Sequence, residues 1–164
     1  MTATEALERL LRSYIQYYNV VRDDVEPPFA AEAIFHTHDE QYVLIKRARI
    51  SEADSSEFVF FATVEDLDEA RLTALDEAAW SRGLARVAPH SAHRNSDITL
   101  IILAEHIDEA AMAAIKKLRH YKSYRLGLQG WSNYRVIALD TSSGLLSCNR
   151  LGRSLKKLLR NIKI

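Results

Sequence analysis

The stretch Ile98-Thr-Leu-Ile-Ile-Leu-Ala104 decides the fold, because its seven residues carry no charge and are mostly β-branched. Such a run is typical of a strand that is covered on both faces, the usual state of a parallel strand in an α/β sheet. The next segment, 108–118, places apolar residues at helical spacing and begins with two acids, which a helix N-terminus favours. The sequence therefore predicts a central strand followed by its crossover helix.

Downstream of this unit, the alternation of apolar residues and turn residues predicts more strands. Tyr124–Leu128 and Tyr134–Leu139 are strand-like runs around a polar turn, and Leu145–Cys148 is a third. Asn149 then caps a last helix, whose leucines lie on one side and whose Arg and Lys residues lie on the other.

Upstream of the unit, the chain begins with a helix and a hairpin. Thr2 and Glu5 form a capping box, and the helix that they start ends near Asn19. Two strand-like runs follow, Ala33–Thr37 and Gln41–Ile50, and the three residues between them are enough for a hairpin turn.

A further strand and helix connect the hairpin to the central strand. Glu57–Ala62 is rich in aromatic residues and predicts a strand. Thr63 and Asp66 match a second capping box, so a helix is expected to begin there and to end at Gly83. Its predicted inward positions include Ala70, Ala74 and Leu75.

These elements define an α/β fold. We expect one domain over 1–164, with a mixed sheet, two parallel β-α-β crossovers, antiparallel hairpins at the edges and flanking helices. The crossovers place the strands at 57–62, 98–104 and 124–128 parallel to one another. A chain of 164 residues is long enough for one substantial core.

Composition excludes several functional classes. The uncharged apolar runs are far below the roughly 18 residues of a membrane span, and the N-terminus does not resemble a signal peptide, so we expect a cytoplasmic protein without a membrane partner. The single Cys148 has no internal disulfide partner. No glycine-rich nucleotide loop, nucleophile elbow or C-x-x-C pair occurs, so no cofactor is expected.

Charge is distributed unevenly along the chain. Residues 116–164 hold twelve Lys and Arg and one acid, a net charge of +11. Residues 1–115 hold ten Lys and Arg and twenty-one Asp and Glu, a net charge of −11. Taken alone, the basic third favours a solvated face, or a half that pairs with the acidic part of the same chain or of a second copy in a homodimer. The alternative is a surface for nucleic acid or for an acidic protein. The candidate polyanion-binding residues are Lys116, Lys117, Arg119, Lys122, Arg150, Arg153, Lys156, Lys157 and Arg160.

The sharpest local motif is His36-Thr-His38-Asp39, because H-x-H on a strand puts both imidazoles on one face, where they could share a metal ion with a carboxylate. It resembles the metal site of JAMM-type isopeptidases, with Ser51 and Asp54 downstream. The chain departs from that motif, since Asp39 replaces a proline and the gap to Ser51 is longer. We therefore expect no bound metal.

Two further observations bear on this hydrolase alternative. His90 and His93 occur in a polar loop and would complete a metal site if the fold brought them to His36. The order of elements also resembles restriction-endonuclease-like domains, whose nucleases hold Mg²⁺ with a (D/E)-x-K motif. Lys46 is the best-placed lysine, but neither it nor Glu57 has the motif's partner two residues away.

A broader resemblance covers most of residues 31–155. The chain resembles a family of bacterial and archaeal domains of unknown function, in a hairpin motif that runs from Ala33 to Ala48 and in the later pairs Gly130-Trp131 and Asn149-Arg-x-Gly152-Arg153. This resemblance implies no activity. Gly152 is expected at a close helix contact, and Trp131 is a candidate binding anchor in a glycine-containing turn.

The sequence thus favours a non-catalytic interaction domain with a basic C-terminal third. The alternative is a divalent-metal-dependent hydrolase or nuclease-like enzyme that uses His36, His38 and Asp39, with Lys46 as a further catalytic candidate.

Overall fold

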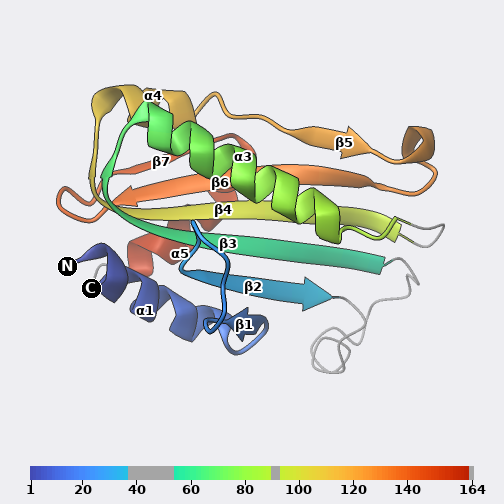
Figure 1. Ribbon diagram of the computed structural model, residues 1–164, viewed down its shortest axis with the longest axis horizontal. Helices are drawn as coiled ribbons and strands as arrows, with labels where there is room; N and C mark the ends of the chain where they lie inside the picture. Colours follow the sequence, from blue (N-terminus) through green and yellow to red (C-terminus); the bar gives the residue numbers. More distant parts are fainter. Residues whose placement is uncertain (37–53, 90–92, 163–164) are drawn as a thin grey trace.

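A computed structural model describes residues 1–36, 54–89 and 93–162. These residues form one α/β domain in which helices cover both faces of a mixed sheet (Figure 1). In chain order the elements are α1 Ala3–Tyr14, β1 Asn19–Val21, β2 Ala31–His36, β3 Asp54–Leu67, α3 Glu69–Arg86, β4 His93–Ile107, α4 Glu109–Ile115, β5 Tyr121–Ser123, the 3₁₀ turn η1 Arg125–Gly127, β6 Trp131–Asp140, β7 Leu146–Cys148, the 3₁₀ turn η2 Leu151–Leu155 and α5 Lys156–Asn161.

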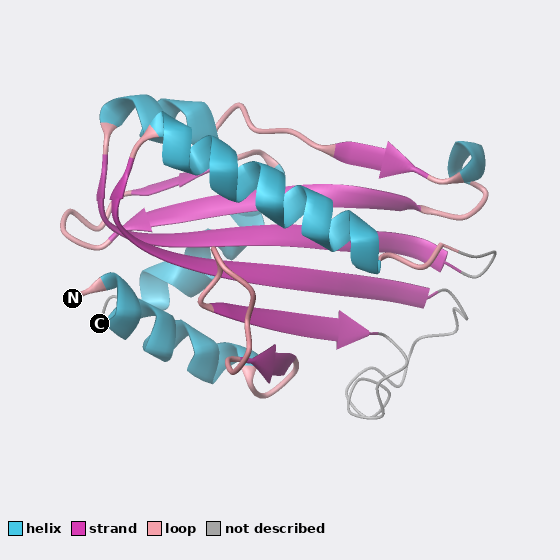
Figure 2. Ribbon diagram, in the orientation of Figure 1, coloured by secondary structure: helices cyan, strands magenta, loops and turns pink. Residues whose placement is uncertain are grey.

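The sheet confirms the predicted fold class. Its strand order is β1-β2-β3-β4-β6-β5, and β7 also pairs with β6. The pairs β3-β4 and β4-β6 are parallel, whereas the outer pairs are antiparallel. Figure 2 shows α3 and α4 on one face and α1 and α5 on the other. None of the described helices is long and apolar enough to cross a membrane.

The central strand is confirmed. Leu100 and Ile102 are fully buried under α3 and α4, and Ile101 and Leu103 are fully buried under α1 and α5. Burial on both faces explains why this stretch lacks the polar alternation of a half-exposed strand. The helix after it begins as predicted, because the carboxylate of Asp108 accepts a hydrogen bond from Ala111 N at 2.7 Å.

The predicted start of the second helix is wrong. Residues 63–66 continue β3, which pairs with β4 as far as Leu67. Leu67 is 1% exposed, so the strand buries one more apolar side chain before the helix begins. Asp68 is the N-cap, and its carboxylate accepts a hydrogen bond from Arg71 N at 2.7 Å. The Thr63 and Asp66 spacing therefore imitates a capping box inside a strand.

The predicted end of this helix at Gly83 is also wrong, because α3 continues to Arg86. A Cβ on Gly83 would lie 2.7 Å from the Ile98 side chain. The glycine thus lets α3 pack closely on β4, which is a packing role and not a cap. Leu75 faces inward as expected, but Ala70 and Ala74 are exposed.

The predicted strand at Tyr124–Leu128 is wrong too. The edge strand β5 lies earlier, at Tyr121–Ser123, and Arg125–Gly127 form a 3₁₀ turn. The strand parallel to β4 is β6, which contains the predicted strand Tyr134–Leu139, while β5 runs antiparallel to β6. The second crossover therefore passes through a short edge strand before it returns to the sheet.

The ends of the chain agree with the sequence analysis in part, because the predicted last helix begins as the 3₁₀ turn η2 and is α-helical only over Lys156–Asn161. Thr2 and Glu5 form the predicted capping box of α1. β2 and β7 occur near their predicted positions, although α1 ends at Tyr14, earlier than expected. The strand predicted at Gln41–Ile50 and its hairpin turn lie outside the described residues.

Candidate functional site

A gap in the edge of the sheet organises the candidate site. β5 pairs with residues 131–133 of β6, and β7 pairs with residues 137–139 of the same strand. The β6 backbone between these ladders needs other hydrogen-bond partners, because a buried strand cannot leave its polar groups unpaired. Asn149, which follows β7, supplies them.

Asn149 replaces the missing strand residue at this gap. It is 3% exposed. Its side-chain oxygen accepts hydrogen bonds from Val136 N at 3.1 Å and Gly152 N at 2.8 Å. Its side-chain nitrogen donates to the carbonyls of Tyr134 at 3.0 Å and Leu118 at 3.1 Å. Both donors and both acceptor positions of the amide are therefore used, so the side chain is fixed in place.

Gly152 allows the chain to approach the strand closely. A Cβ atom on this residue would lie 2.3 Å from the carbonyl oxygen of Val136. The predicted close contact is thus confirmed, although it is made with the β6 backbone. Asn149 and Gly152, two members of the quoted N-R-x-G-R motif, fix the path of the chain that follows β7.

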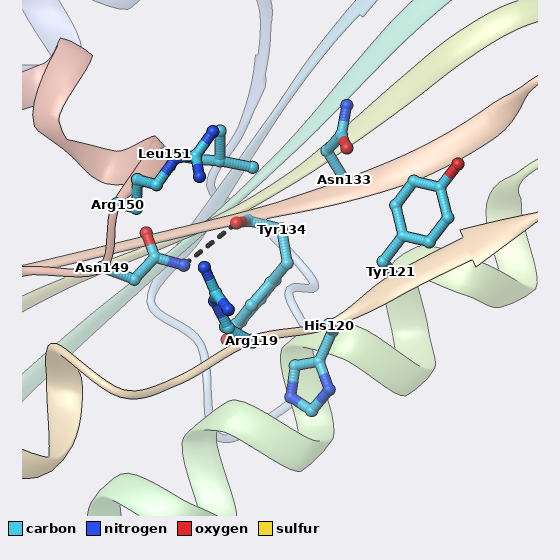
Figure 3. A pocket seen from close by; sticks show the side chains of 8 residues that line it. All are labelled: Arg119, His120, Tyr121, Asn133, Tyr134, Asn149, Arg150 and Leu151. Carbon is cyan, nitrogen blue, oxygen red and sulfur yellow. Dashed lines mark hydrogen bonds between the residues drawn. The ribbon is translucent and has the colours of Figure 1, made fainter.

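The resulting recess, which we call the notch, has a volume of about 480 Å³. It is lined by Arg119, His120, Tyr121, Asn133, Tyr134, Asn149, Arg150 and Leu151. Figure 3 shows Arg119 on the segment that leads to β5 and Arg150 on the segment that follows β7, with Asn149 between them in this view. Among the described residues, the lining holds two predicted arginines, from two separate basic segments, and no acid.

His120 fixes one wall of the notch to α3. Its Nε2 lies 2.9 Å from Oδ2 of Asp76, a buried residue of α3. The imidazole stacks on Trp80 at 5.0 Å between centroids and meets the Tyr134 ring edge-on at 4.8 Å. In Figure 3 this side chain points toward the helix, which leaves Arg119 facing the notch. His120 therefore positions the wall.

Tyr134 lies at the floor of the notch and is 1% exposed. Burial raises the pKa of its hydroxyl well above the ordinary value, and the neighbouring carboxylate of Asp76 adds to the effect. The hydroxyl therefore stays neutral and adds no negative charge to the notch.

Most of the predicted polyanion-binding cations are exposed. Arg119 and Arg150 are exposed, as are Lys116, Lys117, Lys122, Arg153, Lys157 and Arg160, and Lys156 is half-buried. Within the described residues, the ion pairs instead join other cations to acids: Arg22 to Glu8, Arg82 and Arg86 to Glu32, Arg135 to Glu57 and Asp97, and His120 to Asp76. Arg135 and His120 thus pair residues 116–164 with the acidic part of the chain, whereas within the described residues the nine candidate polyanion-binding cations make no ion pair.

Trp131 lies outside the notch lining. It is the first residue of β6, is half-buried and pairs with Asn95 of β4 and Ser123 of β5. Its role as a binding anchor stays a prediction.

The metal-site candidates are described only in part. His36 ends β2, where its Nδ1 lies 2.8 Å from the Ser56 hydroxyl. His93 begins β4, and the register puts both histidine backbones at the same end of the sheet. His38, Asp39, Lys46 and His90 lie outside the described residues. In the part of the chain that the structure describes, no three His, Cys, Asp or Glu side chains are grouped to hold a metal ion.

A second polar cluster lies on the face covered by α1. Arg135 bridges Glu57 at 3.5 Å and Asp97 at 2.7 Å. Glu57 also accepts hydrogen bonds from the hydroxyls of Tyr18, at 2.5 Å, and Thr99, at 3.2 Å. Burial raises the pKa of the Glu57 carboxyl above its ordinary value. Glu57 has three partners within the protein, Tyr18, Thr99 and Arg135, so the cluster resembles a structural network.

The fold and the notch define an α/β domain with a basic recess at a sheet edge. A family model described as Domain of unknown function (DUF8052) matches residues 2–161, so the chain belongs to this family. The predicted resemblance to a domain family of unknown function is thereby confirmed. No curated protein and no solved structure matches the chain.

Sequence reasoning found the arginines of the notch but missed His120, Tyr121 and Asn133, which also line it. A histidine that follows a predicted binding arginine is a weak signal, because its partner Asp76 is distant in sequence. The N-R-x-G-R motif is the better signal, since two of its residues close the strand gap and a third lines the notch.

Proposed function

We propose that this domain is a non-catalytic interaction domain that binds a phosphate-bearing polyanion through the notch. The observation that carries the proposal is the presence of Arg119 and Arg150, from two separate basic segments, in the lining of one recess that contains no acid. A planar guanidinium can donate two parallel hydrogen bonds to a phosphate, so arginine suits this ligand better than lysine.

The surroundings of the notch support the same ligand. Residues 110–139 contain no acid, so the sequence neighbours of Arg119 are basic or neutral. Exposed cations that lack an acidic partner attract a polyanion over about a Debye length, roughly 8 Å at physiological salt. Asn133 adds a neutral amide: its nitrogen donates one hydrogen to Oδ1 of Asp97 at 3.4 Å, and the second hydrogen can donate to a phosphate oxygen or to a sugar hydroxyl.

The test compares two charge-reversal variants of equal net charge. Arg119→Glu with Arg150→Glu removes the notch cations, whereas Arg12→Glu with Arg71→Glu changes two exposed arginines outside the notch lining. Binding of a fluorescein-labelled DNA duplex and retention on heparin are measured over a range of salt concentrations. We expect the notch variant to bind at least about tenfold more weakly and to lower the salt slope by about two.

The control variant should retain most of the binding and the slope. Equal losses in the two variants would mean that net charge, and not the notch, is responsible. No retention of the wild-type protein at low salt would overturn the proposal.

A further inference from the structure

An exposed apolar tip lies on the same edge of the sheet as the notch. Leu126 is 100% exposed and Leu128 is 79% exposed, and Tyr121 of β5 is 65% exposed. These three large apolar side chains fall within eight residues of the sequence. We call residues 125–129 the leucine tip. Figure 1 shows η1, which carries Leu126, beyond the end of β5 at the far end of the sheet edge.

The backbone holds the tip in a defined shape. Arg125 and Leu126 have φ values of 47° and 53°, a left-handed conformation that non-glycine residues rarely adopt. The turn is closed by hydrogen bonds to the Tyr124 carbonyl from Gly127 N and Gln129 N, each at 3.1 Å. A backbone conformation of this kind persists only where the surrounding structure fixes it. In this turn the conformation leaves the Leu126 side chain in solvent.

The charge beside the tip identifies the kind of surface that could cover it. Five cations precede or enter the tip and form what we call the basic edge: Lys116, Lys117, Arg119, Lys122 and Arg125. All five are exposed. Apolar side chains beside Lys and Arg, without acids, are the combination with which peripheral proteins contact anionic lipid.

We infer that the leucine tip and the basic edge dock on an anionic membrane surface. Leu126 and Leu128 enter the boundary between headgroups and acyl chains, while the cations contact lipid phosphates. This inference rests on the proposed function in one respect, since Arg119 belongs to both the notch and the basic edge. It makes the lipid headgroup the source of the phosphate.

Other occupants fit the same surface less well. In a two-fold dimer the edge would meet its own copy, which places cations against cations. Single-stranded nucleic acid could stack a base on the exposed Tyr121 ring, but it would leave Leu126 and Leu128 without a role. Membrane docking departs from the sequence-based expectation of no membrane partner. That expectation was drawn from the lack of a spanning segment or signal peptide, whereas docking needs only exposed apolar side chains beside cations.

The experiment is flotation of the full chain with vesicles of two compositions: phosphatidylcholine alone, and equal parts of phosphatidylcholine and phosphatidylserine. The test variant is Leu126→Asn with Leu128→Ser, since asparagine tolerates the left-handed backbone. The matched control is Ile15→Ser with Leu145→Ser, because these residues are 69% and 62% exposed elsewhere. Each variant is also tested for heparin retention.

We expect the wild type and the control to float with the phosphatidylserine vesicles and not with phosphatidylcholine alone. The tip variant should bind at least about tenfold more weakly and still be retained on heparin. Heparin retention without vesicle binding would refute the membrane inference and leave the proposed function intact. Vesicle binding that the tip variant retains in full would also refute it, since charge alone would then explain the binding. If the wild type neither floats with phosphatidylserine vesicles nor is retained on heparin, both proposals are rejected.

Discussion

Gly152 lies directly against the main-chain carbonyl of Val136, so that a Cβ on the glycine would be 2.3 Å from the carbonyl oxygen. The contact brings the chain after β7 onto the open edge of β6. Because Arg150 lies two residues before this contact, the same approach sets the position of one wall of the notch.

The first prediction concerns this contact. Gly152→Ala should lower the free energy of unfolding by about 2–3 kcal/mol, because the obstructing atom is backbone and cannot rotate away. Urea unfolding measures the change. Gly127→Ala is the matched control, since nothing lies within 4 Å of its Cβ and only its φ of +88° opposes the substitution. The control should cost about 1 kcal/mol. Equal decreases in the free energy of unfolding for Gly152→Ala and Gly127→Ala would contradict the steric explanation.

The second prediction tests the amide of Asn149. Asn149→Asp keeps the shape but replaces the nitrogen that donates to Tyr134 and Leu118 with an acceptor oxygen. Two buried carbonyls would then face a carboxylate, and we expect a loss of about 3 kcal/mol in unfolding free energy. Asn161→Asp, at an exposed position of α5, should leave stability within about 0.5 kcal/mol. Thermal melts of the two variants at neutral pH distinguish these outcomes.

The sequence predicted an element correctly where the residues that determine it are neighbours in the chain. The central strand and the capping box of α1 depend on residues adjacent in sequence, and both were correct. Gly83 was misread as a helix end because its constraint comes from Ile98, on a strand that packs against the helix. The edge strand was placed three residues late because a three-residue strand has almost no periodicity to detect.

The candidate site followed the same pattern. Charge counting located the segments that carry Arg119 and Arg150, but charge alone does not place two segments side by side. Their meeting depends on Asn149, which reaches across to β6 and to Leu118. The metal hypothesis depended on His38 and Asp39, which lie outside the described residues, and His36 alone does not make a site.

The third prediction separates polyanion binding from internal charge pairing. Replacing Lys156, Lys157 and Arg160 with Glu should reduce heparin retention while stability changes little, because within the described residues none of these cations makes an ion pair. Heparin elution and a thermal melt are measured on the same preparation. Substantial destabilisation without loss of retention would instead favour pairing with an acidic surface.

The fourth prediction concerns Asp140 at acidic pH. Burial acts to raise its pKa, but hydrogen bonds from Ser143 N, the Ser142 hydroxyl and Ile107 N hold the pKa below the ordinary value of 3.8. A lowered folded-state pKa contributes stability that is present above 3.8 and is lost as pH falls through the folded-state value. The stability advantage of wild type over Asp140→Asn should therefore shrink as the solution is acidified. Urea midpoints measured at a series of acidic pH values check this trend.

Glu57 should show the opposite pH dependence. Burial raises the pKa of its carboxyl above the ordinary value of 4.5, while the Tyr18 hydroxyl and Arg135 only partly offset that effect. The folded protein therefore holds this proton more tightly than the unfolded chain does. Its stabilising contribution is complete below 4.5 and is lost as pH rises through the folded-state pKa.

Compared with Glu57→Gln, which cannot titrate, the wild type should thus lose relative stability as pH rises above 4.5. The steepest slope that one group can give is about 1.4 kcal/mol per pH unit. Urea unfolding of both proteins across this range measures the difference, and Asp140→Asn provides a comparison of opposite sign. A difference between wild type and Glu57→Gln that grows in favour of wild type with rising pH would show that Arg135 outweighs burial at this carboxyl.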